Sequence, residues 1–594
     1  MLSILLSRYI VDCNVDAIIG QSMRIGTTDA SRSSSDYRDT GTVAVEQNSS
    51  ATYDRGDWVW TRSSFRTLTD VRVASVRDAL SAEELVLGLG SENGQLEKTS
   101  NSKAIAIVGA GSAGLAALKA LLDLPYEIRE GWNIVLFEER RNVSGIWLPD
   151  LNDPHPPVLP ETPLYPSLKT NTPHQTMTYP HFPFPPKTPV FPSHDYISRY
   201  HYDYARSFGL LRFIQFNTSV VRSAWIGNSS VGQWNVTTVD KNTGIQRHQS
   251  FDHFISANGH YRYPNIPTWP GQDDWLGANQ DREIIHSVYW RNGTKYTGKT
   301  VLVVGGRASG RDVVLNTAPH AEKVYLSVRS GILPTRLNAS YVPKPGISHF
   351  TSDSVVFVDG TEESGIDAVV LGTGYELRVP FLTEGGALDV FPGSNTSEDH
   401  ATQLTTNLRY IYPLHEHVFS LAESYPPTAL SFIGLNVLVP NCPTDLAQAL
   451  LVSHAIANPS LLPSRSEMLA GLHAREAHCR ECGYDPFKIG HRLEDIDGFG
   501  NASYVYEEGL VGFLKERGAI PDDGKPYVEE WRRLKFEEYE ALWLAWQRVE
   551  SLGAREVDKW LDGVETEEEW ADLMHRLIDW QKDYDEAYMD PSIH

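Results

Sequence analysis

The segment "KAIAIVGAGSAGLAALKALL" constrains the fold more than any other part of the chain. Its aliphatic run gives way to Gly109, Gly111 and Gly114, and then to a stretch of good helix formers. Glycines in GxGxxG spacing between a buried strand and a helix are typical of a dinucleotide-binding unit. They allow a tight turn, close approach of the pyrophosphate and close packing of helix on strand. We therefore predict that a dinucleotide binds here, with its phosphates at the helix N-terminus beside Ser112.

The strand that follows supports this prediction. "NIVLFEERR" ends in Glu138, whose carboxylate can accept hydrogen bonds from the ribose hydroxyls of an adenosine. The offset from Gly114 is longer than usual, because "DLPYEIREGW" has the composition of a loop insertion. The alternative is a glycine turn without a ligand, followed by a surface glutamate. That alternative does not explain why the glycines stand between a buried strand and a helix.

A second segment, "GKTVLVVGGRASGRDVV", repeats the pattern of a Val-rich strand, closely spaced glycines and a helix. Arg307 stands at the second glycine position, where it must either crowd the phosphates or turn toward them and pair with one. The following strand ends in Ser327 and Arg329 instead of an acid, a combination suited to the 2′-phosphate of NADPH. Two such sites in one chain indicate a flavin and a nicotinamide. The second predicted site comprises Gly305, Arg307, Ser309, Gly310, Ser327 and Arg329.

The composition limits the partners of the chain. Its 594 residues, 41% of them hydrophobic, are enough for two or three domains with sizeable cores. A net charge of −24 argues against nucleic acid or an anionic membrane surface as a general partner. Four cysteines are too few for a disulfide framework, and no stretch approaches the ~18 apolar residues of a membrane span. The few cysteines indicate a reducing compartment, so we expect a cytoplasmic protein. The apolar start is interrupted by Arg8 and lacks a basic region before it, so we expect no cleaved signal peptide.

The pattern along the chain predicts an α/β protein with extensions at both ends. Short aliphatic runs that end in glycine and lead into helical periodicity extend from Lys103 to about Gly490. Residues 1–100 are rich in Ser, Thr and Asp, so we expect a poorly ordered leader with one short helix near "VRDALSAEELVLGL". From Tyr527 on, Trp and Tyr recur at three- and four-residue spacing, which predicts amphipathic helices. We expect these aromatics to pack on the body, with a partner-binding face as the alternative.

From about Lys103 to Met468 the order of motifs resembles that of the flavin-containing monooxygenases, class B flavoprotein monooxygenases, and in particular their fungal branch. "FEERRNVSGIW" is similar to the family's FE…GGxW segment, with Ser144 where the first of its two glycines is expected. "YPSLKTNTPHQTMTYPHFPFP" is close to the segment in which an asparagine, here Asn171, lies at the flavin.

Further segments extend the resemblance. "DAVVLGTGY" matches the threonine-glycine segment that leads back to the FAD domain, and "GLNVLVPNCPTDLAQAL" resembles the family's late segment with a glutamine near the flavin. The resemblance therefore implies one catalytic residue, Asn171, and additional cofactor-binding residues in these segments: Gly145, Trp147, Thr373, Gly374 and Gln448.

The resemblance also implies the architecture, an α/β fold with two Rossmann-like dinucleotide-binding domains. The NADPH domain is inserted in the FAD domain, and a helical extension follows. The implied boundaries are 101–270 for the first part of the FAD domain, 271–380 for the NADPH domain, 381–490 for the second part of the FAD domain, and 491–594 for the acidic, Trp- and Tyr-rich extension.

The implied activity is that of an FAD-dependent NADPH monooxygenase similar to N,N-dimethylaniline monooxygenase. It would use O2 to oxygenate the sulfur or nitrogen of a small thiol, sulfide or amine through a flavin C4a-hydroperoxide. The flavin carries that chemistry, and the protein excludes water and supplies hydrogen bonds, a task suited to the neutral amide of Asn171 and to retained NADP⁺. No dedicated acid or base is required.

Residues that depart from the family pattern leave two alternative functions open. In "WLGANQDREIIHSVYWR", Trp290 stands where Baeyer–Villiger monooxygenases, which act on ketones, have a tryptophan, although Arg291 replaces the Pro or Asp that follows it there. Ser287 after His286 favours the flavin-containing monooxygenases, and we expect His286 to orient the linker between the domains. The second alternative is a degenerate, cofactor-free interaction module, because Ser144 and Arg307 each replace a loop glycine.

The segment "HAREAHCRECGY" offers a CxxC with nearby histidines that could bind zinc. It lacks a spaced second pair, so an unmetallated helix or loop is favoured and we expect no metal site. A flavin disulfide reductase would need such a dithiol near the flavin loop, whereas this one lies far downstream.

Overall fold

The computed structural model describes residues 50–54, 57–61, 102–152, 155–329, 339–393, 402–493, 502–533 and 536–588. The chain divides into two units, residues 1–96 and 97–594. In the first unit, β1 (Ser50–Asp54) and β2 (Asp57–Thr61) form an antiparallel pair. The helix predicted near "VRDALSAEELVLGL" lies outside the described residues.

The larger sheet of the second unit has seven strands in the order β23-β24-β25-β9-β3-β4-β5. Its neighbouring strands β25, β9, β3, β4 and β5 are paired in parallel, which brings their carboxyl ends to one edge of the sheet. The strands are β3 (Ala104–Val108), β4 (Asn133–Phe137), β5 (Ile214–Gln215), β9 (His253–Ser256), β23 (Leu414–His415), β24 (Phe419–Ser420) and β25 (Leu430–Phe432).

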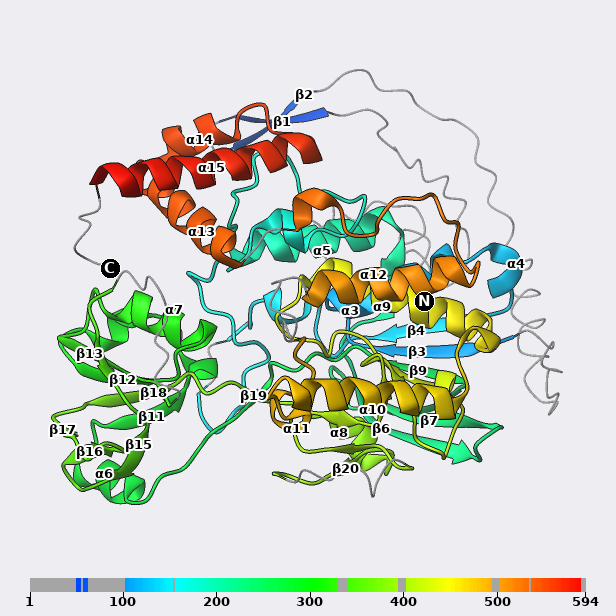
Figure 1. The fold of residues 1–594 in the computed structure, drawn as a ribbon, viewed down its shortest axis with the longest axis horizontal. Helices are drawn as coiled ribbons and strands as arrows, with labels where there is room; N and C mark the ends of the chain where they lie inside the picture. Colours follow the sequence, from blue (N-terminus) through cyan, green and yellow to red (C-terminus); the bar gives the residue numbers. More distant parts are fainter. Residues whose placement is uncertain are drawn as a thin grey trace, which may run out of the picture. The chain divides into compact units, whose positions relative to one another are not determined.

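Both faces of this sheet are covered, which explains why its strands are aliphatic runs without polar alternation. Ile105 and Ile107 of β3 face the helical layer, while Ala106 and Val108 face a second, three-stranded sheet. Figure 1 shows α3, α9 and α12 on one side of the sheet and β6, β7 and α8 on the other. These elements are α3 (Ser112–Asp123), α5 (His194–Ser207), α9 (Asn441–Ala457), α12 (Ala502–Glu516), β6 (Thr218–Gly227), β7 (Gly232–Asp240), β8 (Gln246–Phe251) and α8 (Pro380–Glu384).

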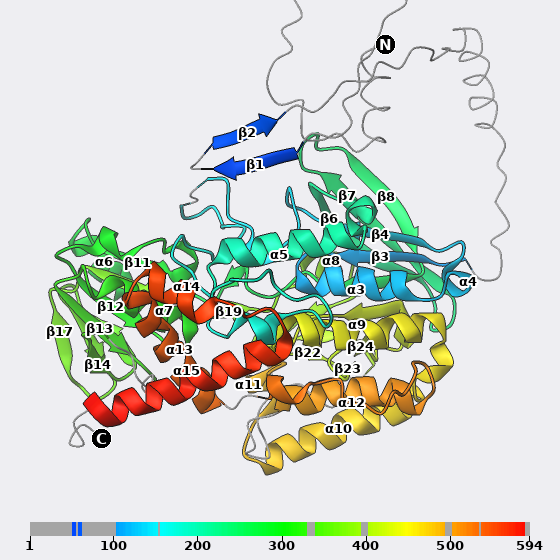
Figure 2. The ribbon, with the colours of Figure 1, turned by 90° about the horizontal axis from the view of Figure 1, so that it is seen from above.

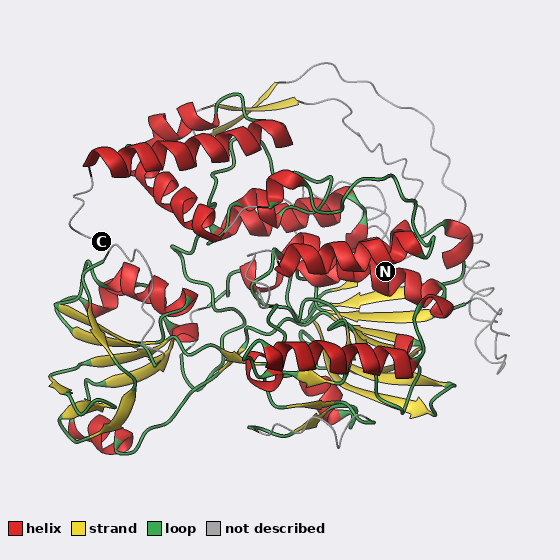
Figure 3. Cartoon of the chain, viewed as in Figure 1, coloured by secondary structure: helices red, strands yellow, loops and turns green. Residues whose placement is uncertain are grey.

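A five-stranded sheet, ordered β11-β18-β12-β13-β14, is built entirely from parallel strands. Its residues, 283–371, come between β9 and β23 of the larger sheet, and the two sheets lie apart in Figure 3. The short antiparallel pair β10 (Tyr263–Pro264) and β19 (Tyr375–Glu376) connects the two bodies. The strands are β11 (Glu283–His286), β12 (Thr300–Val304), β13 (Lys323–Ser327), β14 (Val342–Lys344) and β18 (Ala368–Leu371).

One face of the five-stranded sheet carries α7, and the other carries a small antiparallel sheet and α6. These elements are α6 (Gln272–Ala278), α7 (Ala308–Thr317), β15 (Ile347–Phe350), β16 (Ser354–Phe357) and β17 (Glu362–Ser364). The prediction of a mixed α/β fold is thereby confirmed.

The predicted amphipathic helices are present near the C-terminus. Trp546 and Trp570 are 1% and 4% exposed, and they share a hydrophobic cluster with Val190 and Phe191 of the body. The prediction that this aromatic stripe packs on the body is therefore confirmed. In Figure 2 these helices form one group near α7 and α5. They are α13 (Phe536–Ser551), α14 (Ala554–Leu561) and α15 (Glu567–Tyr588).

The remaining elements are short or peripheral. The insertion "DLPYEIREGW" contains a one-turn helix, α4 (Tyr126–Arg129), with Glu127 in its first turn and Arg129 in its last, which suits the helix dipole. Among the described helices, none combines the length and apolar character that crossing a membrane requires. The others are α10 (Arg465–Glu481), α11 (Pro486–Ile489), β20 (Asp389–Val390), β21 (Thr405–Thr406) and β22 (Ile411–Tyr412).

Candidate functional site

The first glycine loop joins β3 to α3 at the carboxyl edge of the seven-stranded sheet. Gly109 has φ of 99°, and a Cβ there would lie 2.5 Å from the Ala257 carbonyl oxygen. A Cβ on Gly114 would lie 1.7 Å from the Gly109 carbonyl oxygen. Because both obstructions are backbone atoms, only glycine fits at these two positions. The loop therefore places free amides at the N-terminus of α3, a geometry suited to phosphate.

Glu138 ties this loop to the end of β4. Its side chain is 4% exposed, Oε2 accepts a hydrogen bond from the Ala110 amide at 2.6 Å, and Oε1 accepts one from the Arg140 amide at 2.8 Å. Burial raises the pKa of this carboxyl, and the two amide hydrogen bonds oppose that shift. Each carboxylate oxygen keeps a second lone pair that could accept from a ribose hydroxyl.

The turn after β4 closes on the same loop. Ser144 has φ of 104°, the region that favours glycine, and its buried hydroxyl hydrogen-bonds His201 Nδ1 at 2.9 Å. Its amide donates to the Ala110 carbonyl at 2.9 Å. A Cβ on Gly111 would lie 3.6 Å from the Gly145 Cα, so two backbones meet where the pyrophosphate is predicted. Half-buried Trp147 packs on the helical core cluster.

Gln448, on α9, is fully buried and uses its whole amide inside the protein. Its Oε1 accepts from the Gly434 amide at 2.9 Å, and its Nε2 donates to Asn436 Oδ1 at 2.6 Å and to the Tyr506 hydroxyl at 2.9 Å. The residue thus supports the segment after β25, at the same sheet edge as the first glycine loop.

Sequence reasoning missed Asp445, one turn earlier on α9. It is 3% exposed and faces Ser112 in the first turn of α3, and burial raises its pKa to about 7. The signal was an acid within "CPTDLAQAL", a helical run whose other residues are mostly apolar or small. A carboxyl beside the N-terminus of α3 adds a titratable group to the predicted phosphate site.

The second glycine loop, between β12 and α7, repeats the first. Gly305 has φ of 106°, and its Cβ would lie 2.4 Å from the Gly372 carbonyl oxygen. A Cβ on Gly310 would lie 1.7 Å from the Gly305 carbonyl oxygen. Arg307 is the N-cap residue directly before α7, with φ of −86° and ψ of −170°, extended backbone that any residue adopts, and it is exposed. The arginine therefore fits without strain at the helix end that would receive phosphate.

The strand next to this loop ends in one buried and one exposed polar residue. Ser327 is 1% exposed and donates its hydroxyl hydrogen to the Pro345 carbonyl at 2.7 Å. Arg329 is exposed, and Ser309 is half-buried in the first turn of α7. Arg329 and Arg307 thus follow neighbouring parallel strands and offer two cations at the same sheet edge.

The linker residues bind each other across the connection between the sheets. His286 Nε2 donates to the Gly374 carbonyl at 3.0 Å, and Nδ1 accepts from the Val288 amide at 3.1 Å. Burial lowers the pKa of His286 to about 4, so the ring is neutral near pH 7. Thr373 donates its hydroxyl hydrogen to the Asn265 carbonyl at 2.6 Å. Both His286 ring nitrogens make hydrogen bonds to backbone groups, which fits the predicted role of His286 in orienting the linker between the domains.

Asn171 lies in an exposed turn of the segment between α3 and α5. Within the part of the chain that the structure describes, its side-chain amide makes no hydrogen bond, so it does not act as a turn cap. The flanking residues are anchored, because the Thr170 amide donates to Pro192 and Lys169 pairs with Glu550 of α13 at 2.7 Å. Asn171 therefore presents a free amide from a fixed backbone.

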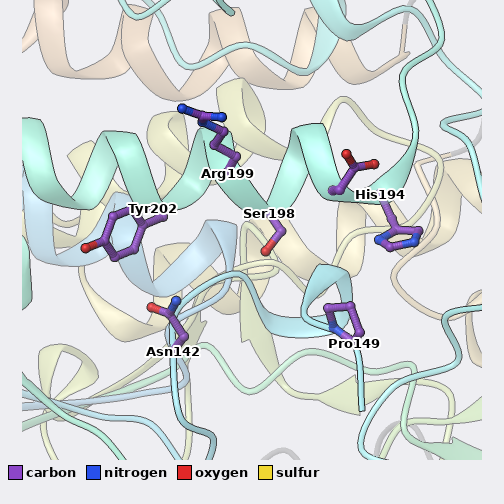
Figure 4. Close-up of a pocket in the computed structure, with 7 residues that line it drawn as sticks. Asn142, Pro149, His194, Ser198, Arg199 and Tyr202 are labelled. Carbon is purple, nitrogen blue, oxygen red and sulfur yellow. The ribbon is translucent and has the colours of Figure 1, made fainter. Parts of the chain in front are cut away.

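Two other features are separate from these loops. In the described ranges, no group of three or more His, Cys, Asp or Glu side chains could hold a metal ion; Cys479 is buried on α10 and Cys482 is exposed at its end. A cavity of about 300 Å³ lies between α5 and the turn after β4, where Ser198 and Tyr202 point toward that turn (Figure 4). Its lining residues are Asn142, Pro149, His194, Asp195, Ser198, Arg199 and Tyr202, none of them a predicted cofactor contact.

Comparison with known proteins agrees with this geometry. The family model described as "Flavin-binding monooxygenase-like" matches residues 102–337 and 332–481, a span that holds both glycine loops. The chain belongs to this family. It is accordingly a flavoprotein monooxygenase, and membership implies a flavin cofactor, FAD.

Its relatives among curated proteins include plant enzymes. Flavin-containing monooxygenase FMO GS-OX5 of Arabidopsis thaliana is 29% identical over 502 residues, covering 80% of this chain and 96% of that protein. FMO GS-OX-like 4 of the same plant is 28% identical over 455 residues, covering 72% and 89%. Membership of this flavin-binding monooxygenase in the fungal branch stays a prediction.

Two solved structures show the same fold. S-allyl-L-cysteine S-oxygenase from Allium sativum is 24% identical with a TM-score of 0.60, covering 82% of this chain and 99% of that one. Tmm from a Pelagibacter species is 20% identical with a TM-score of 0.56, covering 77% and 90%.

Proposed function

We propose that this flavin-binding monooxygenase uses NADPH and O2 to oxygenate the sulfur or nitrogen of a small molecule. The observation that carries the proposal is the pair of glycine loops with matching backbone geometry, one at the carboxyl edge of each parallel sheet. FAD is assigned to the first loop, which Glu138 locks, and NADPH to the second, which carries two exposed arginines. Residues 271–380 then form the NADPH domain inserted between the parts of the FAD domain.

The residues present fit both groups. The first loop offers the α3 amides, Glu138 for ribose, and a glycine at 111 whose missing side chain leaves room toward Gly145. The second offers the α7 N-terminus with Arg307 and Arg329. Bound FAD supplies the acceptance of hydride and the activation of dioxygen. The chain's own residues bind and orient both cofactors, and Asn171 offers an uncommitted amide for a hydrogen bond between them.

The helices near the C-terminus anchor the segment that carries Asn171. Glu550 of α13 pairs with Lys169, two residues before Asn171. The Trp570 ring of α15 meets His174 edge-on, with ring centroids 4.7 Å apart. The segment that carries Asn171 is thus anchored to these helices on both sides of the exposed Asn171, which keeps the position of its backbone fixed.

Sulfur is the favoured acceptor atom. The Allium sativum enzyme of the same fold is named as an S-oxygenase, and this likeness supports a thiol or sulfide substrate here. Trp290, the residue that kept the Baeyer–Villiger alternative open, is 2% exposed and packs edge-on against Tyr165 at 4.9 Å. Core packing accounts for this tryptophan, so it does not by itself indicate a ketone substrate.

The test is NADPH oxidation by FAD-loaded enzyme with a thioether, a thiol, a tertiary amine and a cyclic ketone, with products identified by mass spectrometry. We expect S- or N-oxygenated products from the first three compounds and no lactone. Lactone as the main product would assign the enzyme to ketone oxidation instead.

Asn171→Leu tests the role of the free amide. The loss of one hydrogen bond costs about 1–3 kcal/mol, so we expect a folded, yellow enzyme that oxidises NADPH but releases roughly ten times more hydrogen peroxide per NADPH. Thr172→Val, in the same turn, is the control and should remain coupled. Equal peroxide release by Asn171→Leu and the parent would remove Asn171 from the site.

A further inference from the structure

Asp150 lies between two arginines that belong to different sheets. Arg140 follows β4 of the seven-stranded sheet, and Arg291 follows β11 of the five-stranded sheet. One carboxylate oxygen of Asp150 is 3.6 Å from Arg140 Nη2, and the other is 3.6 Å from Arg291 Nη2. The side chains of all three residues are at most 16% exposed. A mostly buried carboxylate thus bridges the two bodies of the protein.

Arg140 is anchored in the first body. Its Nη1 donates to the Gly145 carbonyl at 2.8 Å and its Nη2 to the Leu148 carbonyl at 2.6 Å. Its Nε donates to Glu161 at 3.1 Å. Because Gly145 is the residue that meets Gly111 of the first glycine loop, Arg140 connects the bridge to the predicted flavin site.

Arg291 is anchored in the second body. Its Nη1 donates to the Val288 carbonyl at 2.8 Å and to the Trp290 carbonyl at 3.1 Å. The Trp290 ring packs edge-on against Tyr165, whose hydroxyl donates to Asp312 in α7 at 2.5 Å. Tyr165 lies between β4 and α5, so these contacts are a second connection between the bodies, and they reach the helix that begins at the second glycine loop.

The bridge depends on both arginines. Burial raises the pKa of Asp150, while Arg140 and Arg291 counteract that shift. Removal of one partner from a buried charge leaves the remaining charge poorly compensated, so the two arginines stabilise the carboxylate together. Both contacts are ion pairs at 3.6 Å, longer than a hydrogen bond, so the hydrogen bonds of each arginine to its own backbone carbonyls set the positions of the charges that hold Asp150.

We propose that Asp150 and Arg291 form a positioning latch that fixes the nicotinamide-binding body against the flavin-binding body. The latch sets the approach of the nicotinamide to the flavin without contacting either. The proposal rests on the proposed function, and it gives a role to Arg291, which departs from the residue types expected after Trp290.

The variants Asp150→Asn and Arg291→Gln test the latch. Asn has the shape of Asp and leaves the bonds of both arginines to backbone carbonyls in place. In anaerobic stopped-flow measurements, we expect each variant to slow flavin reduction at saturating NADPH about tenfold, with flavin content and NADPH affinity changed less than about twofold. The double variant should be no slower than the slower single one, because both changes break the same contact.

Lys295→Gln is the matched control. Lys295 pairs with Glu283 at 2.7 Å, but both residues belong to the second body, so the reduction rate should stay at the parent value. Additive losses in the double variant, or an equal loss in this control, would overturn the latch.

A second readout does not require catalysis. Hydrogen–deuterium exchange of the connecting segments 258–264 and 373–377, in FAD-loaded protein without NADPH, should be faster in Asp150→Asn and Arg291→Gln and unchanged in Lys295→Gln. Exchange and reduction rates equal to those of the parent would show that the contact is only structural. If NADPH does not reduce the parent at all, the proposed function fails, and the exchange measurement still decides whether the latch exists.

Discussion

The two glycine loops agree at their outer positions and differ at the middle one. In both loops a side chain on the last glycine would lie 1.7 Å from the carbonyl oxygen of the first. The first glycines have nearly equal φ angles, 99° and 106°, and each would strike the backbone that follows a neighbouring parallel strand. The protein itself therefore requires glycine at the outer positions, with or without a ligand.

The residue type at the middle position depends on what lies next to the loop. Gly111 faces the backbone of Gly145, whereas Arg307 faces solvent in an extended conformation. The residues after β4 and β13 also differ in exposure. Glu138 is buried and hydrogen-bonded to the first loop, whereas Arg329 is exposed. The first loop is closed and suits a cofactor that stays bound, and the second is open and suits one that exchanges.

The largest expected effect comes from Gly114→Ala and Gly310→Ala. Each methyl group would overlap a carbonyl oxygen that cannot move without opening the turn, so we expect a loss above about 3 kcal/mol in binding at the affected loop. Gly114→Ala should purify without flavin. Gly310→Ala should keep its flavin and bind NADPH more than about a hundredfold more weakly. Absorbance and fluorescence titration measure the two effects, and loss of flavin from both variants would contradict separate sites.

Asp445→Asn sharpens the comparison, because Asp445 places a buried carboxyl beside the N-terminus of α3. The folded pKa of about 7 lies above the ordinary value of an aspartate, so its stabilising effect is complete in acid and is lost as the pH rises through about 7. The negative charge of neighbouring Glu507 also raises the pKa of Asp445. Relative to the parent, the variant without cofactor should gain about 2–3 kcal/mol in unfolding free energy between pH 5 and pH 8. Denaturant titration at both pH values measures this, and a constant difference would exclude the assigned pKa.

Glu138→Ala removes the carboxylate that closes the first loop. The change should weaken FAD binding by about 1.5–3 kcal/mol, since it deletes the proposed charge-assisted bond to ribose and releases the Ala110 amide. Ser327→Ala, after the corresponding strand of the second loop, should leave FAD affinity unchanged. Flavin fluorescence on dilution reports both constants, and unchanged retention in Glu138→Ala would disprove the role of the acid.

Arg329→Ala tests the open side of the second loop. Loss of a cation at the 2′-phosphate should raise the KM for NADPH about tenfold or more and leave the KM for NADH nearly unchanged. Steady-state kinetics with both nucleotides measure the ratio. An equal rise for both would make Arg329 a structural residue.

Arg307→Gly, which restores the missing glycine, should have the smallest effect. The backbone there needs no glycine, so stability should change by less than about 0.5–1 kcal/mol, and NADPH should bind only a few times more weakly. Tighter NADPH binding would mean that the arginine crowds the phosphates, as the sequence alone left open.

Local geometry could be predicted from the sequence, and pairings distant in the chain could not. The strand-turn-helix units around Gly109 and Gly305 follow from glycine sterics and residue order, and the C-terminal helices follow from their aromatic period. The bridge between Asp150 and Arg291 joins residues far apart in the chain, and no spacing rule connects them. Asp445 was hidden for the same reason, since its neighbour Ser112 comes from another helix. At Ser144 the backbone has a positive φ, at a position where the family pattern has glycine. The hydrogen bond from Ser144 to His201, a residue distant in the chain, could not be predicted from the sequence.

The central claim is that the first loop holds FAD and the second delivers NADPH to it. Anaerobic titration of the purified, yellow protein with NADPH, followed by flavin absorbance, tests it most directly. The account predicts complete bleaching by NADPH, faster than by NADH, with normal bleaching by dithionite but greatly weakened bleaching by NADPH in Gly310→Ala. A colourless protein that cannot be reconstituted with FAD, or a flavin that NADPH does not bleach, would contradict it.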